Sequence, residues 1–374
     1  MIVGVLKEPT GESRVSLLPE QVETLRKKNV TVYVENGAGK LAFAEDTAYT
    51  DKGAKIVSRQ EILSGADLIL SINPISDSDI NAAKKGAIFL GVYQPLFNFS
   101  EINSWASKGF TVFSMDMIPR TTRAQSMDVL SSQANIAGYK AVLTAANLFP
   151  RYFPMFMTAA GSIAPAKVLI LGAGVAGLQA IATARRLGAV VEVFDTRPAV
   201  KEEVMSLGAK FIEVEGASDA SKAGGYAVEQ SKDYEEKQSR RISEAISKAD
   251  IVITTAQIPG KKAPLLVPNS MLGSMKHGSI IVDLAASTGG NTEQTKNNDT
   301  VQYNGVTIVG NSNLSAGMPF DASKMYGKNI LNFLALIIDK DGNINLNFED
   351  DLVKGTCIAH NGEVTNSRVK ELIK

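Results

Sequence analysis

Short apolar runs alternate with amphipathic segments along nearly the whole chain. In the first third the apolar runs lie at residues 2–6, 30–35, 67–72, 87–92 and 110–115. Between them, polar and apolar residues recur at helical spacing. Apolar strands separated by helices are typical of a parallel sheet that is covered on both faces. The pattern therefore predicts an α/β unit.

The same alternation starts again after a long helical stretch, at about residues 124–148. The second set of predicted strands comprises residues 167–173, 190–195, 210–215, 250–255, 279–285 and 306–311. A strongly apolar helix at 323–340 is expected to pack back on the first unit. The fold class is then α/β, with two doubly wound Rossmann-like units joined by long helices and a cleft between them. The predicted domains are 1–125 plus 325–374, and 126–324.

Composition limits the classes of function. The chain has 374 residues, with 39 basic and 39 acidic side chains, so no net charge favours nucleic acid or an anionic membrane. One cysteine, Cys357, excludes an internal disulfide, and with only two histidines we expect no metal site. Pro165 and Lys167 interrupt the apolar segment 155–184, so we predict no transmembrane helix. The N-terminus lacks the pattern of a signal peptide.

A nucleotide fingerprint follows the first strand of the second set. Gly172, Gly174 and Gly177 form G-x-G-x-x-G between a predicted strand and a predicted helix, and Asp195 closes the next strand. These glycines permit a tight turn, close approach of a pyrophosphate and close helix packing. A carboxylate at Asp195 binds the hydroxyls of an adenosine ribose and repels a 2′-phosphate, so NAD(H) is favoured over NADP(H). Arg197 is expected to stack on the adenine or to pair locally.

A polar cluster occupies residues 119–133, PRTTRAQSMDVLSSQ, and contains no His, Cys or Lys. Gln125, Asp128 and Ser131 are spaced i, i+3, i+6, which predicts one face of a helix. A capped helix terminus with solvated polar groups is the plainer interpretation. It accounts for Ser126 or Asp128 singly, but not for the whole cluster.

On these motifs the chain resembles the NAD(H)-binding component, domain I, of proton-translocating transhydrogenase. The resemblance runs from GVLKEPTGESRVSLLPEQV through RAQSMDVLSSQ and GAGVAGLQAIATARRLGAVVEVFDTRP to VDLAASTGGN. It implies that NAD(H) binds here and passes a hydride to NADP(H) on a partner domain. It also implies a membrane domain as partner, a homodimer, and a peripheral place on the cytoplasmic face of a bacterial-type inner membrane or on a matrix-like side.

The resemblance also implies roles for individual residues. Arg120, Gln125, Asp128 and Ser131 would hold the nicotinamide end of NAD(H). Tyr226 follows Gly224 and Gly225 in the polar segment 215–241, which is expected to be a surface loop or a lid over the site. The expected cofactor-binding residues are Gly172, Gly174, Val175, Gly177, Asp195, Thr196, Arg197, Gly225, Gln238, Ala256 and Gln257.

Alanine dehydrogenase shares this fold family and is the alternative enzyme. Its catalytic Lys would fall in the run SINPI (71–75), its His near Gln94, and its later Asp at Ser287, so three of its catalytic positions differ here; only Arg14 matches. An amino-acid dehydrogenase must move a proton as well as a hydride, whereas hydride exchange between two nicotinamides needs orientation alone. A non-catalytic NAD-binding module is the second alternative.

Overall fold

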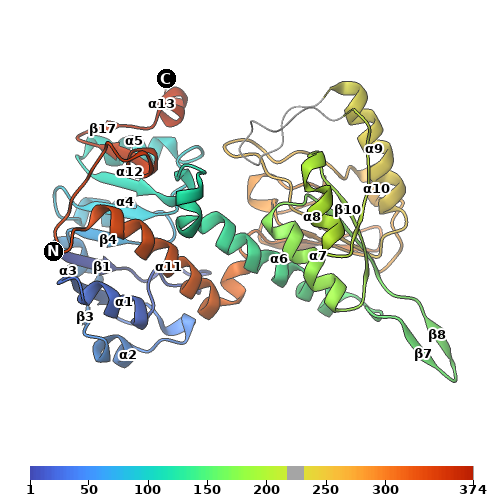
Figure 1. The fold of residues 1–374 in the computed structure, drawn as a ribbon, viewed down its shortest axis with the longest axis horizontal. Helices are drawn as coiled ribbons and strands as arrows, with labels where there is room; N and C mark the ends of the chain where they lie inside the picture. The colour runs from blue at the N-terminus through green and yellow to red at the C-terminus, as the bar shows by residue number, and fades with distance from the viewer. Residues whose placement is uncertain (217–230, 374) are drawn as a thin grey trace. The chain divides into compact units, whose positions relative to one another are not determined.

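The computed structural model describes residues 1–216 and 231–373. They divide into two compact units: unit 1 is Met1–Gln133 with Ala316–Lys374, and unit 2 is Ala134–Ser315. The sequence pattern places the same divisions after residues 125 and 324. The first division of the structure falls inside helix α6 (Val129–Leu148), where the amino-acid pattern continues without a break. The elements of both units are labelled in Figure 1.

Unit 1 is built on an eight-stranded sheet with the order β17-β16-β6-β5-β4-β1-β2-β3. The six strands β1 to β6 run parallel, and β16 and β17 are antiparallel at one edge. The strands are β1 (Ile2–Val5), β2 (Thr31–Glu35), β3 (Lys55–Val57), β4 (Leu68–Leu70), β5 (Ile88–Gly91), β6 (Thr111–Ser114), β16 (Cys357–His360) and β17 (Glu363–Val364).

Successive side chains of these strands enter two different cores, because strand residues alternate between the faces of a sheet. In β4, Leu68 and Leu70 join one core and Ile69 joins the other. Helices cover both faces, which explains the continuous apolar runs in the sequence. The helices of unit 1 are α1 (Pro19–Arg26), α2 (Asp46–Asp51), α3 (Arg59–Gly65), α4 (Asp77–Ala82), α5 (Phe99–Ser107), α11 (Pro319–Ile337), α12 (Asp351–Thr356) and α13 (Ser367–Ile373).

Unit 2 contains a seven-stranded sheet with the order β11-β10-β9-β12-β13-β15-β14, in which only β14 is antiparallel. Its strands are β9 (Lys167–Leu171), β10 (Val190–Phe194), β11 (Lys210–Phe211), β12 (Ile251–Thr254), β13 (Ile280–Asp283), β14 (Asp299–Tyr303) and β15 (Val306–Gly310). The helices are α6, α7 (Val175–Arg186), α8 (Lys201–Ser206), α9 (Lys232–Ile246) and α10 (Asn269–Leu272). Residues of α7 and α9 lie in the cores on opposite faces of this sheet.

The strand order of unit 2 locates its ligand crevice. From the central strand β9 the chain proceeds to β10 and β11 on one side, then crosses to β12 on the other side of β9. The loops that follow β9 and β12 therefore diverge at the carboxyl edge of the sheet. In open α/β sheets a ligand binds at such a switch point.

Three features differ from the predicted elements. The sheets are not wholly parallel, because β14, β16 and β17 are antiparallel edge strands. The predicted strand 210–215 is limited to Lys210–Phe211. The predicted helix at 124–148 begins only at Val129, after the 3₁₀ helix Thr122–Met127.

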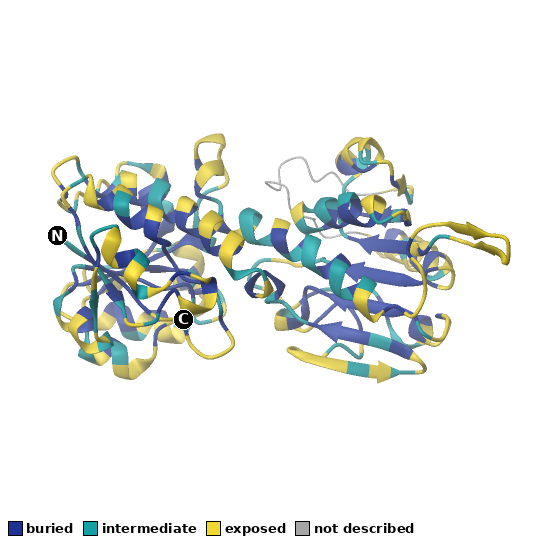
Figure 2. Cartoon of the chain, turned by 90° about the horizontal axis from the view of Figure 1, so that it is seen from below, coloured by how far each residue is buried: buried dark blue, intermediate teal, exposed yellow. Residues whose placement is uncertain are grey.

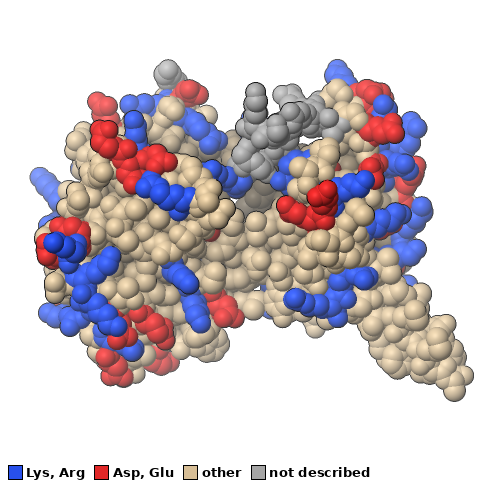
Figure 3. All heavy atoms as spheres, in the orientation of Figure 1, with Lys and Arg blue, Asp and Glu red and all other residues tan. Residues whose placement is uncertain are grey.

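A separate two-stranded hairpin was not anticipated. Strands β7 (Phe156–Thr158) and β8 (Gly161–Ile163) pair with each other, and every residue of both is exposed (Figure 2). Figure 3 shows no charged side chain on it, whereas acidic and basic side chains are interspersed elsewhere on that face of the molecule. The hairpin thus combines high exposure with apolar composition.

Candidate nucleotide site

The glycine loop after β9 has the geometry that the fingerprint requires. Gly172 has a φ of 107°, a conformation that L side chains rarely adopt, and a Cβ there would overlap the Thr255 hydroxyl. A Cβ at Gly177 would overlap the carbonyl oxygen of Gly172, so α7 packs directly on the loop. At Gly174 a Cβ would meet open space. The backbone beside Gly174 is therefore accessible to a ligand.

The N-terminus of α7 opens at this loop. Gly174 is its N-cap and supplies no side chain, and Val175, the first helical residue, is 40% exposed. The N–H groups of the first turn lack partners within the helix, and the helix dipole is positive at this end. This arrangement is suited to binding a pyrophosphate, as the sequence predicts.

Asp195 follows β10 and is only 9% exposed. Its Oδ2 accepts the Ala173 N–H at 2.7 Å, which ties the end of β10 to the glycine loop. Arg197 donates its N–H and Nε–H to Oδ1 at 2.8 and 2.9 Å, and an Nη2–H to Oδ2 at 2.8 Å. This hydrogen-bonded ion pair raises the pKa of the Arg197 guanidinium. Arg197 thus pairs locally, one of its two expected roles.

The contacts of Asp195 have a consequence for ligand binding. A carboxylate offers about four lone-pair positions, and the bonds from Ala173 and Arg197 number four. A ribose whose hydroxyls bond Asp195 must therefore replace part of the Arg197 contact. Thr196, between the two charged residues, is half-buried.

Helix α9 brings a further residue to Asp195. Tyr234 is 2% exposed, and its pKa is raised by burial and by the negative charge of Asp195. Tyr234 was not predicted from the sequence, because it is one tyrosine in a highly charged helix and no motif marks it. Gln238, one turn further along α9, is half-buried. The candidates Gly225 and Tyr226 lie outside the described residues.

The loop after β12 forms the other side of the switch point. Thr255 donates its hydroxyl to the Gly172 carbonyl at 3.1 Å, so this loop contacts the glycine loop directly. Gln257 donates to the Leu284 carbonyl at 2.9 Å. The amide side chain of Asn291 bonds both the N–H and the carbonyl of Ala256. Asn291 is another residue that sequence reasoning did not identify.

The polar cluster of 119–133 lies in unit 1, where it borders a cavity of about 300 Å³. Three of its candidates, Arg120, Gln125 and Asp128, line that cavity. Ser131 does not line it, but donates its N–H and hydroxyl to the Asp128 carboxylate at 2.9 and 2.6 Å. The other lining residues are Ile118, Pro119, Thr121, Thr122 and Ala124. None of these residues has a side chain that titrates near neutral pH.

The predicted common helical face is wrong. Gln125 lies in the 3₁₀ helix, Asp128 has an extended backbone with ψ of 91°, and Ser131 belongs to α6. The carboxylate of Asp128 accepts the N–H of residue i+3, as an N-cap does. This is the role that the plainer interpretation assigned to Asp128 alone. The candidates are gathered by a turn instead of a helix.

The candidate loop is firmly held within unit 1. Ala124 and Met127 are buried in the core beneath it. The carbonyl of Ser126 accepts hydrogen bonds from Asn329 and Asn332 of α11 at 2.8 and 2.9 Å. These contacts fix the backbone between two exposed side chains, Arg120 and Gln125.

The positions of alanine dehydrogenase chemistry hold other groups. Arg14 donates to the Glu12 carboxylate at 2.6 and 2.8 Å and to Gln133 at 2.8 Å. In the run 71–75, Asn73 donates to Glu8 at 2.9 Å. Burial raises the pKa of Glu8, although the N–H groups of Ile72 and Asn73 oppose that shift. Gln94 is exposed with a φ of 48°, and Ser287 is exposed on the loop after β13.

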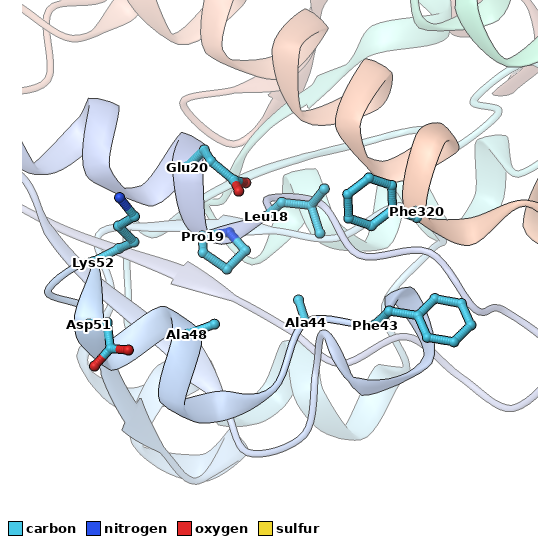
Figure 4. A pocket seen from close by; sticks show the side chains of 9 residues that line it. All are labelled: Leu18, Pro19, Glu20, Phe43, Ala44, Ala48, Asp51, Lys52 and Phe320. Atoms are coloured by element: carbon cyan, nitrogen blue, oxygen red, sulfur yellow. The ribbon is translucent and has the colours of Figure 1, made fainter.

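A second cavity, of about 250 Å³, lies elsewhere on unit 1 and contains no candidate residue (Figure 4). Its wall is largely apolar, and the Lys52 ammonium at its rim is bound to Glu23 at 2.9 Å. Across 1–216 and 231–373, no cluster of His, Cys, Asp and Glu is arranged to hold a metal ion. In the same ranges no helix has the length and apolar character needed to cross a membrane.

Comparison with known proteins matches both units. The N-terminal domain model described as "Alanine dehydrogenase/PNT" covers residues 4–137, and the C-terminal domain model of the same description covers 141–367. In Rickettsia prowazekii the alpha subunit of NAD(P) transhydrogenase is divided, and the chain is 45% identical to its first polypeptide, over 99% of this chain and 97% of that protein. It is 42% identical to NAD(P) transhydrogenase subunit alpha of Haemophilus influenzae, over 97% of this chain and 71% of that protein.

Solved structures show the same relationship. A transhydrogenase from Sinorhizobium meliloti superposes with a TM-score of 0.89 at 45% identity, over 97% of this chain and all of that one. An L-alanine dehydrogenase gives a TM-score of 0.82 at 23% identity, over 100% and 99% of the two chains. The second similarity shows a shared fold.

Proposed function

Since this chain belongs to the alanine dehydrogenase/PNT family, we propose that it binds NAD(H) and exchanges a hydride directly with NADP(H) on a partner domain. One combination of features carries the proposal. Unit 2 has a complete dinucleotide cradle, and the polar cavity of unit 1 is lined by groups that cannot act as acid or base near neutral pH. Relatives at 42–45% identity are named as transhydrogenase alpha subunits.

The choice of NAD(H) rests on Asp195. Its buried carboxylate lies at the end of β10 beside the glycine loop, where a 2′-phosphate would meet a negative charge. The adenosine ribose takes hydrogen bonds from Asp195 as Arg197 moves from its present contact. Val175, Thr196, Gln238, Ala256 and Gln257 complete the cofactor site in this proposal, with Gly225 from the segment outside the described residues.

Hydride exchange places modest demands on the protein. When bound, NADH supplies the hydride and its electron pair, and NADP⁺ accepts both, so no proton is taken up or released by a side chain. Orientation and electrostatic support then supply the catalysis. Gln125 and Arg120 bond the carboxamide or a phosphate, while Asp128 and Ser131 hold the turn that carries them. Tyr226 closes over the cofactor.

The proposal extends to partners. An NADP(H)-binding domain and a membrane domain complete the transhydrogenase, which places this chain at the membrane on the cytoplasmic or matrix-like side. We further propose a homodimer. The exposed apolar hairpin supports it: Met155, Phe156 and Met157 are 62, 44 and 74% exposed, which is unusual on a monomeric surface.

Alanine-type dehydrogenation is the second candidate, since the fold is shared. Asn73, Gln94 and Ser287 supply none of the acid–base groups that amination of a keto acid needs. One cuvette with pyruvate, ammonia and NADH separates the two. We expect no oxidation of NADH above the background rate, and rapid oxidation would replace the proposed function by this one.

The proposed cofactor is tested by titrating NADH and NADPH separately and following the fluorescence of the reduced nicotinamide. We expect NADH to bind and NADPH to bind far more weakly. Equal affinity for the two, or none for NADH, would contradict the cofactor assignment.

A further inference from the structure

A nine-residue loop, 256–264, leaves the carboxyl end of β12, and one buried side chain closes both of its ends. Asn291 has no exposed surface. Its Oδ1 accepts the Ala256 N–H at 3.1 Å, and its Nδ2 donates to the Ala256 carbonyl at 2.9 Å. Nδ2 also donates to the Pro264 carbonyl at 2.8 Å. The neck of the loop is thus held by a single amide group.

Asn291 is itself held by Asp283, the last residue of β13, which also has no exposed surface. The Oδ2 of Asp283 accepts the N–H of Asn291 at 2.6 Å and the hydroxyl of Thr295 at 2.6 Å. Its Oδ1 accepts the Ala285 N–H at 2.9 Å. Burying a carboxylate and an amide is costly unless they are bonded in this way. The chain from β13 to the loop is therefore rigid.

The position of the loop in the sheet says which portion of a dinucleotide it meets. Asp195 lies on β10, on one side of β9, and the loop starts from β12 on the other side. Because the adenosine ribose is bound on the Asp195 side, the loop faces the half of the cofactor beyond the pyrophosphate. Thr255, directly before the loop, contacts the glycine loop at Gly172.

We propose that Asn291, fixed by Asp283, is a positioning residue for the nicotinamide half of NAD(H). It acts through the loop: it sets the backbone of Ala256 and the direction in which Gln257 leaves the sheet, and it need not touch the cofactor itself. This inference rests on the proposed NAD(H) binding.

The test compares two ligands. Asn291→Ala should raise the Kd of NADH by about tenfold, the scale of losing one or two hydrogen bonds. The Kd of 5′-AMP, which has only the adenosine half, should change by less than about twofold. Asp283→Asn should show the same split in a weaker form. Hydrogen exchange at Ala256 and Ala263 should accelerate in both variants.

Asp250→Asn is the matched control. Asp250 is 6% exposed and bonds the Lys167 N–H at the opposite, amino edge of the same sheet, so its loss destabilises unit 2 without altering the preference for NADH over AMP. If Asn291→Ala does not fold, Asn291→Asp, which retains the acceptor for the Ala256 N–H, is measured in the same way.

Two outcomes would overturn the inference. One is a folded Asn291 variant that binds NADH with the wild-type Kd. The other is an equal loss of affinity for NADH and 5′-AMP, which would indicate a merely structural role. A wild-type protein that binds neither ligand would instead overturn the proposed function, and the inference with it.

Discussion

Asp195 was identified from its place at the end of a strand, but its contacts could not be read from the sequence. The G-x-G-x-x-G spacing predicts a carboxylate near the ribose, and the structure has that carboxylate at the glycine loop. The competing Arg197 lies only two residues away, and whether such a pair meets depends on backbone angles after β10. The structure shows that it does meet.

Asp195→Asn should weaken NADH binding by roughly 1–3 kcal/mol, because charge-assisted hydrogen bonds to the ribose are lost. An NADH titration measures the effect. Glu192→Gln is the matched control, since Glu192 lies on the same strand and pairs with Lys210 at the surface. If both variants bind NADH as the wild type does, Asp195 is not part of the nucleotide site.

Gln125→Ala should slow hydride transfer by roughly tenfold to a hundredfold, because a misplaced nicotinamide loses the contact geometry of the reaction. The Kd of NADH should stay within about twofold, since the adenosine and pyrophosphate contacts are untouched. Single-turnover transfer and equilibrium binding measure the two quantities, with the exposed Gln60→Ala as control. Loss of binding in place of transfer would refute the role of Gln125 as a positioning group.

At the scale of elements, buried parallel strands were the easiest to predict. β4, β9 and β12 are continuous apolar runs because both faces of each strand are covered. The antiparallel edge strand β14 reads DTVQY and is largely exposed, so its polar pattern resembles a loop. The hairpin β7–β8 packs on neither core, and no periodicity marks it.

The turn that carries the candidate cluster was misread for a related reason. Spacing alone does not distinguish a 3₁₀ turn followed by an N-cap from a continuous helix. The difference is made by tertiary contacts: Asn329 and Asn332 bind the Ser126 carbonyl, and Arg123 pairs with Asp350 and Asp351. All four partners lie between 203 and 228 residues further along the chain.

The ion pair between Arg123 and Asp350 should stabilise this turn in a pH-dependent way. Hydrogen bonding to Arg123 lowers the pKa of Asp350. The stabilisation is therefore complete above the ordinary carboxyl pKa and is lost as the pH falls through the lowered value. Asp350→Asn, which retains a side-chain acceptor for the Leu352 N–H, should lower the thermal midpoint at neutral pH by a small amount.

Near about pH 3 the midpoints of Asp350→Asn and wild type should converge. Asp339→Asn is the control, because Asp339 also has a lowered pKa but bonds only its own loop. A difference that stays constant with pH would show that the ion pair contributes nothing.

At the scale of the molecule, the exposed hairpin should mediate self-association. Met157→Asp places a charge at its most exposed apolar side chain and should convert a dimer to a monomer in sedimentation or light scattering. The exposed Ser107→Asp in unit 1 should leave the mass unchanged. A dimer that survives Met157→Asp would show that the hairpin does not hold it, and a monomeric wild type would contradict the homodimer itself.

The central claim is direct hydride exchange, and one assay tests it. The purified chain is mixed with a separately prepared NADP(H)-binding domain of a transhydrogenase that carries NADP⁺, and NADH is added in a rapid-mixing instrument. We predict reduction of the bound NADP⁺ within a single turnover, and none when this chain is left out. Binding of NADH with no reduction of NADP⁺ would contradict the account and leave a non-catalytic NAD-binding module.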